Sequence, residues 1–256
     1  MSSASPAGAL QILVPDWPAP ALVRAAFTLR SGGVSPAPFG SLNVGVHVGD
    51  LPDAVRENRL RVREGLQLPS EPAWIEQVHG TEVADLDAPA ADAAPGAPAD
   101  AVFTRQPRRV CVVQVADCMP VLLASRDGSC VAAAHAGWRG LAAGVLEATL
   151  RRLATQPVQL LAWLGPAIGP QHFEVGSEVR DAFVTHDSGA AAAFGANSRG
   201  RWQCDLAALA RQRLRAAGVT ALFGGECCTY ADPARFFSYR RDGQCGRMAA
   251  LIWLAG

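Results

Sequence analysis

The sequence contains no lysine, and all 23 of its basic residues are arginine. Without lysine the chain cannot form a Schiff base with a substrate, and it has no Walker-type phosphate loop. Any anion held by a charged side chain must therefore be bound by arginine or histidine. The 23 acidic residues cancel the 23 arginines. This zero net charge argues against a general nucleic-acid-binding protein, which normally carries an excess of positive charge.

Disulfide, ribbon and membrane signals are lacking as well. The seven cysteines are an odd number and no two of them have C-x-x-C spacing, so neither a disulfide framework nor a zinc ribbon is expected. The N-terminal residues show no basic segment followed by an apolar core, which argues against a signal peptide. No apolar run is long enough to span a bilayer. We therefore expect a reduced, cytoplasmic protein with no membrane or nucleic-acid partner.

Half of the 256 residues are apolar, which is enough for a large hydrophobic core. Short apolar runs predict strands buried on both faces. They cover Val110 to Val115, Pro120 to Ser125, Cys130 to His135 and Val158 to Gly165. Asp127-Gly128, between the second and third runs, predicts a hairpin turn.

Amphipathic spacing predicts three helices. The first begins after Asp53 as its N-cap, the second runs from Trp138 to about Leu153, and the third starts at Asp205 and ends at Gly218. Hairpins mixed with strand–helix connections predict an α+β fold. The segments 87–100 and 187–200, rich in Ala, Pro and Gly, are predicted to be surface loops.

Two histidines and one cysteine stand in short, glycine-marked or strand-end motifs. They are His79 in EQVHGTEV, Cys118 in ADCMPVLL and His135 in HAGWRG. Two imidazoles and a thiolate form a good zinc donor set, and three protein ligands leave the fourth position open for water or substrate. The separations of 39 and 17 residues are too long for a zinc finger but suit a catalytic site built from separate loops. The alternative is a hydrogen-bonded histidine and a cysteine that packs as a small apolar residue.

Other motifs suggest substrate contacts. Arg139, at a predicted helix start after His135, could bind a phosphate or carboxylate, although G-x-x-G is also common in plain tight turns. Asn43 and His47 lie in a glycine-dense loop that suits close approach to a ligand or is simply structured. Arg240, in FFSYRRDG, could line the edge of a pocket for a ring and an anion, or lie on an amphipathic strand. The polar neighbours of the trio, Glu76, Gln77 and Asp117, are candidate acid/base helpers.

Together, SLNVGVHVGD, EQVHGTEV, ADCMPVLL, AAAHAGWRGL, AWLGPAIGP, FEVGSEV and FFSYRRDGQCGRMA resemble the YfiH-like family, once labelled laccase-like or polyphenol oxidase. The resemblance runs from about Thr28 to Leu254. It implies a single α+β domain over residues 1–256, with mixed β-sheets forming a sandwich flanked by helices. It also implies zinc bound by His79, Cys118 and His135, which would carry catalysis.

The activity implied by this resemblance is that of a purine nucleoside enzyme. Its reactions would be phosphorolysis of adenosine, inosine, guanosine and methylthioadenosine, and deamination of adenosine. Purine nucleosides and phosphate are then the partners of the protein, which we expect to be a monomer or weak homodimer. The candidate substrate or phosphate contacts are Arg139, Asn43, His47, Gln77 and Arg240.

Three rival interpretations stay open. A copper polyphenol oxidase is disfavoured because five histidines are too few for a blue-copper site plus a trinuclear cluster, although copper can replace zinc on the same ligands. A cysteine-type amide hydrolase, including one that edits cell-wall precursors, would use Cys118 as nucleophile and His135 as base. A purely structural zinc protein fits poorly, since structural zinc sites normally have four ligands.

Overall fold

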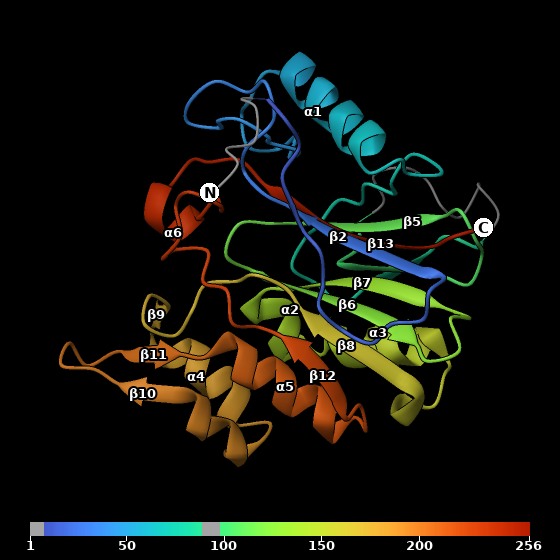
Figure 1. Cartoon of the computed structure of the whole chain (residues 1–256). Coiled ribbons are helices and arrows are strands. Elements are labelled where there is room, and N and C mark those ends of the chain that lie inside the picture. Colours follow the sequence, from blue (N-terminus) through green and yellow to red (C-terminus); the bar gives the residue numbers. More distant parts are fainter. Residues whose placement is uncertain (1–7, 89–97) are drawn as a thin grey trace, which may run out of the picture.

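Two β-sheets stacked face to face form the centre of the molecule, and helices cover both outer faces (Figure 1). The structure is a computed structural model that describes residues 8–88 and 98–256. The first sheet is antiparallel, with the strand order β1 (Ile12–Leu13), β2 (Val23–Thr28), β13 (Met248–Leu254) and β5 (Val110–Val115).

The second sheet is mixed and has six strands. Their order is β12 (Ala221–Gly224), β8 (Leu160–Leu164), β6 (Met119–Ser125), β7 (Val131–Ala136), β4 (Ala101–Thr104) and β3 (Val83–Asp85). The pairs β12–β8 and β3–β4 are parallel, and the other neighbours are antiparallel. A small third sheet contains β10 (Phe194–Ala196), β11 (Trp202–Cys204) and β9 (Glu174–Val175).

The strand sequences are continuously apolar because each central strand is buried on both faces. In β13, Met248, Ala250 and Ile252 pack between the two sheets. Their neighbours Ala249 and Leu251 point to the opposite face, toward α1 (Pro52–Gly65). A shift of register by one residue would exchange these two sets, but both are apolar; the packing partners on each side therefore specify the register.

The outer face of the six-stranded sheet packs against α2 (Trp138–Ala143), α3 (Val145–Leu153), α4 (Ser177–Val184) and α5 (Leu206–Ala216). The chain also contains α6 (Tyr239–Asp242) and two short 3-10 segments, Pro157–Gln159 and Ser188–Ala193. The layers are thus α1, sheet, sheet and helices, so the predicted α+β sandwich flanked by helices is confirmed. Among the described residues, no helix is both long enough and apolar enough to cross a membrane.

Several element boundaries differ from the prediction. The helix expected from Trp138 to about Leu153 is two helices, because Gly144 between them adopts a left-handed φ of 99°. Asp53 is not an N-cap: Leu51 holds that position without a side-chain bond, and Asp53 lies in the first turn, paired with Arg56. The predicted cap at Asp205 is confirmed, since its carboxylate accepts a hydrogen bond from the Ala208 amide.

Two predicted irregular segments are also corrected. Residues 187–200, expected as a loop, contain a 3-10 segment and β10, because Phe194 is buried and its strand pairs with β11. The strand alternative for FFSYRRDG is wrong: residues 239–242 form α6, and the Ser238 hydroxyl caps it by accepting from the Arg241 amide. Of the predicted loop 87–100, residues 89–97 lie outside the described residues.

Candidate metal centre

The three predicted metal ligands meet at one end of the six-stranded sheet. Cys118 directly precedes β6 and His135 lies at the end of β7, and these two strands are antiparallel neighbours. His79 comes from the loop that leads into β3. The ligand atoms of the three side chains all lie within 4.8 Å of one another. Fold topology therefore assembles residues that are far apart in the sequence.

Asp100, a residue not singled out from the sequence, orients the centre. Its buried carboxylate is 2.8 Å from His135 Nδ1 and accepts hydrogen bonds from the amides of His79 and Gly80 at 2.9 and 2.5 Å. The Val78 amide also donates to it, at 3.2 Å. With Nδ1 turned to the carboxylate, His135 presents Nε2 to the centre, the arrangement typical of metal-bound histidines.

The same carboxylate explains the unusual backbone of His79. His79 has a φ of +61°, a left-handed conformation that is uncommon for a residue other than glycine. Three successive amides, from Val78 to Gly80, turn toward Asp100. Four hydrogen-bond contacts to one buried carboxylate offset the cost of this conformation.

The glycines of HAGWRG provide room for the centre. A Cβ on Gly137 would lie 2.8 Å from Cys118 Sγ and 3.2 Å from His79 Cδ2. A Cβ on Gly140 would lie 2.9 Å from the Gly80 carbonyl oxygen. Such contacts are too short, so any side chain at either position would displace a ligand or the loop that carries it. These two glycines are therefore required by close packing around the ligands.

The electrostatics of the centre favour a thiolate. Burial alone would raise the pKa of the Cys118 thiol, but the charge of His135 and hydrogen bonds from both histidines lower it to about 6. Burial alone would lower the pKa of His135, but Cys118 and Asp100 together raise it to about 9. Hydrogen bonds from His135 and from the Gly80 and His79 amides outweigh burial and lower the pKa of Asp100.

The donor set fits a zinc ion. Tetrahedral zinc with nitrogen and sulfur ligands needs ligand atoms about 3.3–3.6 Å apart. Cys118 Sγ and His79 Nε2 are 3.9 Å apart, and the imidazole rings of the two histidines meet edge-on with centroids 4.8 Å apart. The three ligand atoms, which lie within 4.8 Å of one another, would have to approach one another by up to about 1 Å to reach ligand distances. In the described part of the chain this is the only group of three or more His, Cys, Asp or Glu side chains that could hold a metal.

The predicted substrate contacts differ in their exposure and in their neighbours. Arg139 is exposed and lies over the Trp138 ring, with 4.4 Å from its Cζ to the centroid. His47 is exposed, and its pKa is lowered by desolvation and then by nearby positive charges. In decreasing order, those charges belong to Arg247, Arg59, His135 and His79. The influence of the two ligand histidines indicates that His47 lies in the neighbourhood of the centre.

The remaining candidates hold loops in place. The buried Asn43 amide bonds to Gly45, Asp50 and the Arg247 amide. The Gln77 amide bonds in both directions with the Gln114 backbone, at 2.7 and 2.8 Å. The Arg240 guanidinium donates to the Glu174 carbonyl.

Asp117 also acts as a structural anchor. Its carboxylate accepts from the hydroxyls of Thr229 and Ser238, at 2.6 and 3.0 Å, and from the Arg240 amide at 2.7 Å. These bonds tie the segment around α6 to the residue beside Cys118. The backbone of Asp117 has a φ of +89°, which the three bonds help to maintain.

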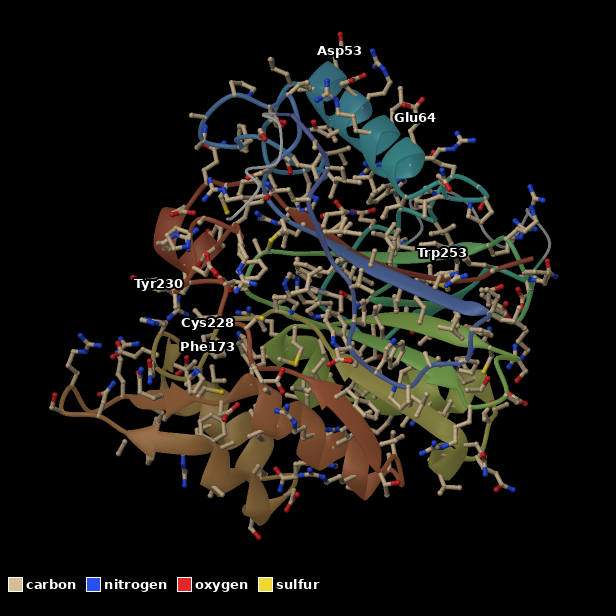
Figure 2. All side chains as sticks on the ribbon, viewed as in Figure 1. Asp53, Glu64, Phe173, Cys228, Tyr230 and Trp253 are labelled. Carbon is tan, nitrogen blue, oxygen red and sulfur yellow. The ribbon has the colours of Figure 1, made fainter. Side chains whose placement is uncertain are left out.

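A cavity of about 300 Å³ is lined by Met119 and by residues of the segments 167–172 and 225–231. Cys228, which lines it, accepts a hydrogen bond from the Gly169 amide at 3.2 Å, and Tyr230 stacks on His172. Figure 2 shows Cys228, Tyr230 and Phe173 close together between α6 and the small sheet. The metal ligands do not line this cavity.

A two-sheet α+β fold whose loops join two imidazoles, a thiol and a supporting carboxylate defines a protein with a candidate three-ligand metal site. The chain belongs to the family described as multi-copper polyphenol oxidoreductase laccase, whose model matches residues 24–255. It is 55% identical to purine nucleoside phosphorylase PA4543 of Pseudomonas aeruginosa over 94% of this chain and 98% of that protein. The predicted membership of the YfiH-like family is thereby confirmed.

Other relatives agree in length and fold. Purine nucleoside phosphorylase YfiH of Escherichia coli is 52% identical over 95% of this chain and 99% of its own. The crystal structure of Neisseria meningitidis protein NMB0706 is 50% identical, with a TM-score of 0.90 over 96% of this chain and 99% of that one. Both matches span nearly the whole described fold.

Proposed function

We propose that this protein is a zinc-dependent purine nucleoside phosphorylase that also deaminates adenosine. Its expected substrates are adenosine, inosine, guanosine and methylthioadenosine, with inorganic phosphate as co-substrate. Curated relatives at 52–55% identity bear the name purine nucleoside phosphorylase. The observation that carries the proposal is the convergence of His79, Cys118 and His135 within 4.8 Å, with Asp100 orienting one imidazole.

Phosphorolysis exchanges one bond for another at the anomeric carbon of the ribose. An oxygen of hydrogen phosphate forms a bond to C1′ while the C1′–N9 bond breaks, and the bond electrons leave on the purine. The proton of the phosphate ends on the departing base, so the products are ribose 1-phosphate and the neutral purine. The protein must hold both reactants in line and exclude water.

The residues of the centre suit this task. When bound to His79, Cys118 and His135, zinc would supply a Lewis acid next to the reacting groups. Asp100 keeps His135 fixed, and Gly137 allows Cys118 and His79 to approach each other. Arg139, four residues after the ligand His135, is exposed.

Deamination of adenosine needs a proton-transferring group as well. Of the three sequence candidates, Asp117 and Gln77 are occupied by structural hydrogen bonds. The Glu76 carboxylate makes no side-chain hydrogen bond or ion pair within the described residues, and Glu76 lies three residues before the ligand His79. We therefore assign the acid/base role to Glu76.

Product chromatography tests the proposal. Adenosine is incubated with zinc-loaded and chelator-stripped protein, with and without phosphate. Phosphate-dependent adenine and phosphate-independent inosine, both lost on stripping, are expected. Absence of both products from loaded protein would refute the nucleoside activity.

One observation favours a second candidate, a cysteine-type amide hydrolase that includes cell-wall precursors among its substrates. The lowered pKa of Cys118 and the raised pKa of His135 describe a thiolate–imidazolium pair. Metal distinguishes the two functions: a thiol nucleophile is blocked by tight zinc, so stripping would activate amide hydrolysis and abolish nucleoside chemistry.

Copper oxidation fits the residues poorly. The family description names a multi-copper laccase, yet the described residues contain only one group of three candidate ligands. That is fewer than a blue-copper and a trinuclear site require. Copper bound adventitiously at His79, Cys118 and His135 remains chemically reasonable.

We further propose that the protein is a cytoplasmic monomer or weak homodimer. The described chain has seven free cysteines, which is compatible with a reducing compartment. Light scattering across a range of concentrations measures the oligomeric state, and a stable tetramer would contradict this proposal.

A further inference from the structure

Two arginines and a histidine gather around one loop. The loop, residues 43–48, carries His47, and two arginines from distant segments flank it. Arg59 of α1 donates from Nε to the Val44 carbonyl at 3.0 Å, and the Arg247 carbonyl accepts from the Val44 amide at 3.2 Å. The same residue therefore joins both arginines, three positions before His47.

The sequence of the loop makes room for Arg247. A Cβ on Gly45 would lie 2.7 Å from Cγ of Arg247, so the arginine stem crosses the loop at this glycine, two residues before His47. The Arg247 amide is held by Asn43 Oδ1 at 2.9 Å. Its Nη1 binds the carbonyls of Cys245 and Gly246, whereas Nε and Nη2 have no hydrogen-bond partner in the described chain.

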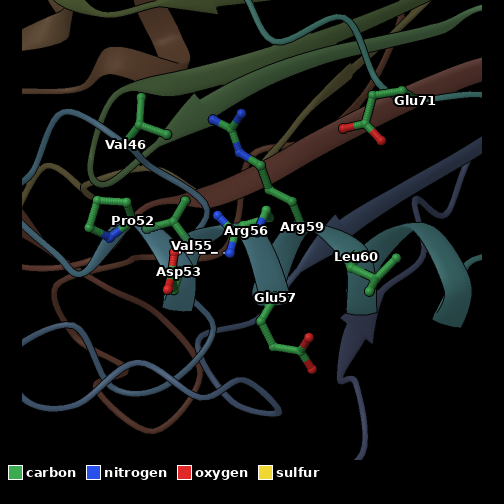
Figure 3. A pocket seen from close by; sticks show the side chains of 9 residues that line it. All are labelled: Val46, Pro52, Asp53, Val55, Arg56, Glu57, Arg59, Leu60 and Glu71. Carbon is green, nitrogen blue, oxygen red and sulfur yellow. Dashed lines mark ion pairs between the residues drawn. The ribbon is translucent and has the colours of Figure 1, made fainter.

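Arg59 is half-buried without a counter-ion. Its guanidinium stacks on the Trp74 ring with 3.9 Å from Cζ to the centroid. Its two terminal nitrogens donate to none of the described residues. Burial lowers its pKa to about 10, although the charge of Glu71 acts in the opposite direction. Figure 3 shows the Arg59 guanidinium reaching toward Val46, while Arg56 on the same helix is paired with Asp53.

The neighbouring carboxylates are committed elsewhere. The oxygens of Asp50 accept from the Ser35 hydroxyl, the Asn43 amide group and the Leu51 amide. Glu71 accepts from the Trp74 indole at 2.8 Å and lies 3.7 Å from Arg63. A half-buried arginine without an anionic partner is unfavourable. Arg59 and Arg247 thus keep N–H donors without a partner among the described residues, which a bound anion would occupy.

We propose that Arg59, Arg247 and His47 form the subsite that binds the phosphate co-substrate beside the metal centre. The proposal rests on the phosphorylase function proposed above and locates its second substrate. Arginines suit this role because the guanidinium binds phosphate oxygens through paired hydrogen bonds. The subsite replaces Arg139 as the main phosphate contact, since Arg139 lies over Trp138 at the surface.

Two variants test the subsite with little change in packing. Arg247→Met keeps the stem that crosses Gly45 and removes the charge. Arg59→Gln keeps a donor for the Val44 carbonyl and removes the guanidinium. Arg56→Gln is the matched control, because Arg56 lies on the same helix, is exposed and, among the described residues, forms its ion pair with Asp53. Circular dichroism and melting curves confirm folding of each protein.

The first measurement is equilibrium dialysis with labelled inorganic phosphate and zinc-loaded protein, without nucleoside. We expect Arg247→Met and Arg59→Gln each to weaken phosphate binding at least about tenfold, with Arg247→Lys restoring part of it. Arg56→Gln should bind like the unmodified protein. The subsite would be overturned if the unmodified protein bound no phosphate. It would also be overturned if both variants bound phosphate as tightly as the unmodified protein.

The second measurement separates this proposal from the proposed function. In the phosphorolysis assay, the KM for phosphate should rise about tenfold or more in both variants, with the nucleoside KM changed less than about threefold. A raised phosphate KM in Arg139→Gln, but not in these two variants, would place phosphate at Arg139 instead. If dialysis shows the expected losses but no nucleoside reacts, the subsite stands and the phosphorylase function fails.

Discussion

Replacement of Asp100 by asparagine is expected to loosen the metal centre while the protein stays folded. Each carboxylate oxygen of Asp100 serves two donors: one accepts from His135 Nδ1 and the His79 amide, the other from the Val78 and Gly80 amides. An asparagine amide has an NH2 group in place of one oxygen. Whichever way the side chain is turned, that NH2 group meets two donors, and His135 loses its charged partner.

The magnitude follows from these contacts. Loss of the carboxylate behind a metal-bound histidine typically weakens metal binding about 10- to 100-fold, which is about 1.4–2.7 kcal/mol. Leaving buried donors unpaired costs about 1–3 kcal/mol of folding stability. In a chain of this size each kcal/mol lowers the melting temperature by about 2–4 °C. The variant should therefore melt several degrees lower but remain folded at room temperature.

Competition with a coloured chelator measures the zinc affinity, and circular dichroism measures folding. Asp85→Asn is the control, because Asp85 pairs with Arg152 at a partly exposed site away from the ligands. It should keep the zinc affinity of the unmodified protein. A folded Asp100→Asn protein with unchanged zinc affinity would refute the role assigned to this carboxylate.

Three further predictions concern the same centre. Gly137→Ala should lose zinc and activity, because its Cβ would lie 2.8 Å from Cys118 Sγ. The control Gly195→Ala, whose Cβ would have no atom within 4 Å, should keep both. Equal zinc content in the two variants would contradict the packing argument. In zinc-stripped protein, the absorbance of the Cys118 thiolate should appear as the pH rises through about 6, and Cys118→Ser should lack it. A midpoint near the ordinary thiol pKa of 9 would contradict this prediction. Asp117→Asn should lower the melting temperature by freeing Ser238 and the Arg240 amide, with zinc binding retained. An unchanged melting temperature would argue against its anchoring role.

The strands of the core could be predicted from the sequence because burial on both faces leaves continuous apolar runs, as in β5 and β7. The metal ligands were visible because imidazole and thiol groups in tight motifs are few. The break at Gly144 was not foreseen, since one glycine inside an amphipathic pattern does not reveal a left-handed φ. The single-domain organisation over residues 1–256 stays a prediction.

The supporting residues could not be predicted because their roles depend on contacts between distant segments. Asp100 follows an Ala- and Pro-rich stretch, and only the pairing of β4 with β7 brings it to His135. Arg59 has the spacing of an ordinary exposed helix residue, and Arg247 follows a glycine near the C-terminus. Their meeting at Val44 is a property of the fold alone.

The dependence of phosphorolysis on zinc at His79, Cys118 and His135 is tested most directly by measuring zinc content and products on one sample. Inosine and phosphate are supplied to chelator-stripped protein, to the same protein reloaded with one equivalent of zinc, and to Cys118→Ser treated in parallel. Ribose 1-phosphate and hypoxanthine are expected in equal amounts from the reloaded protein only, in proportion to bound zinc. Equal product from the stripped protein, or none from fully loaded protein, would contradict this dependence on zinc.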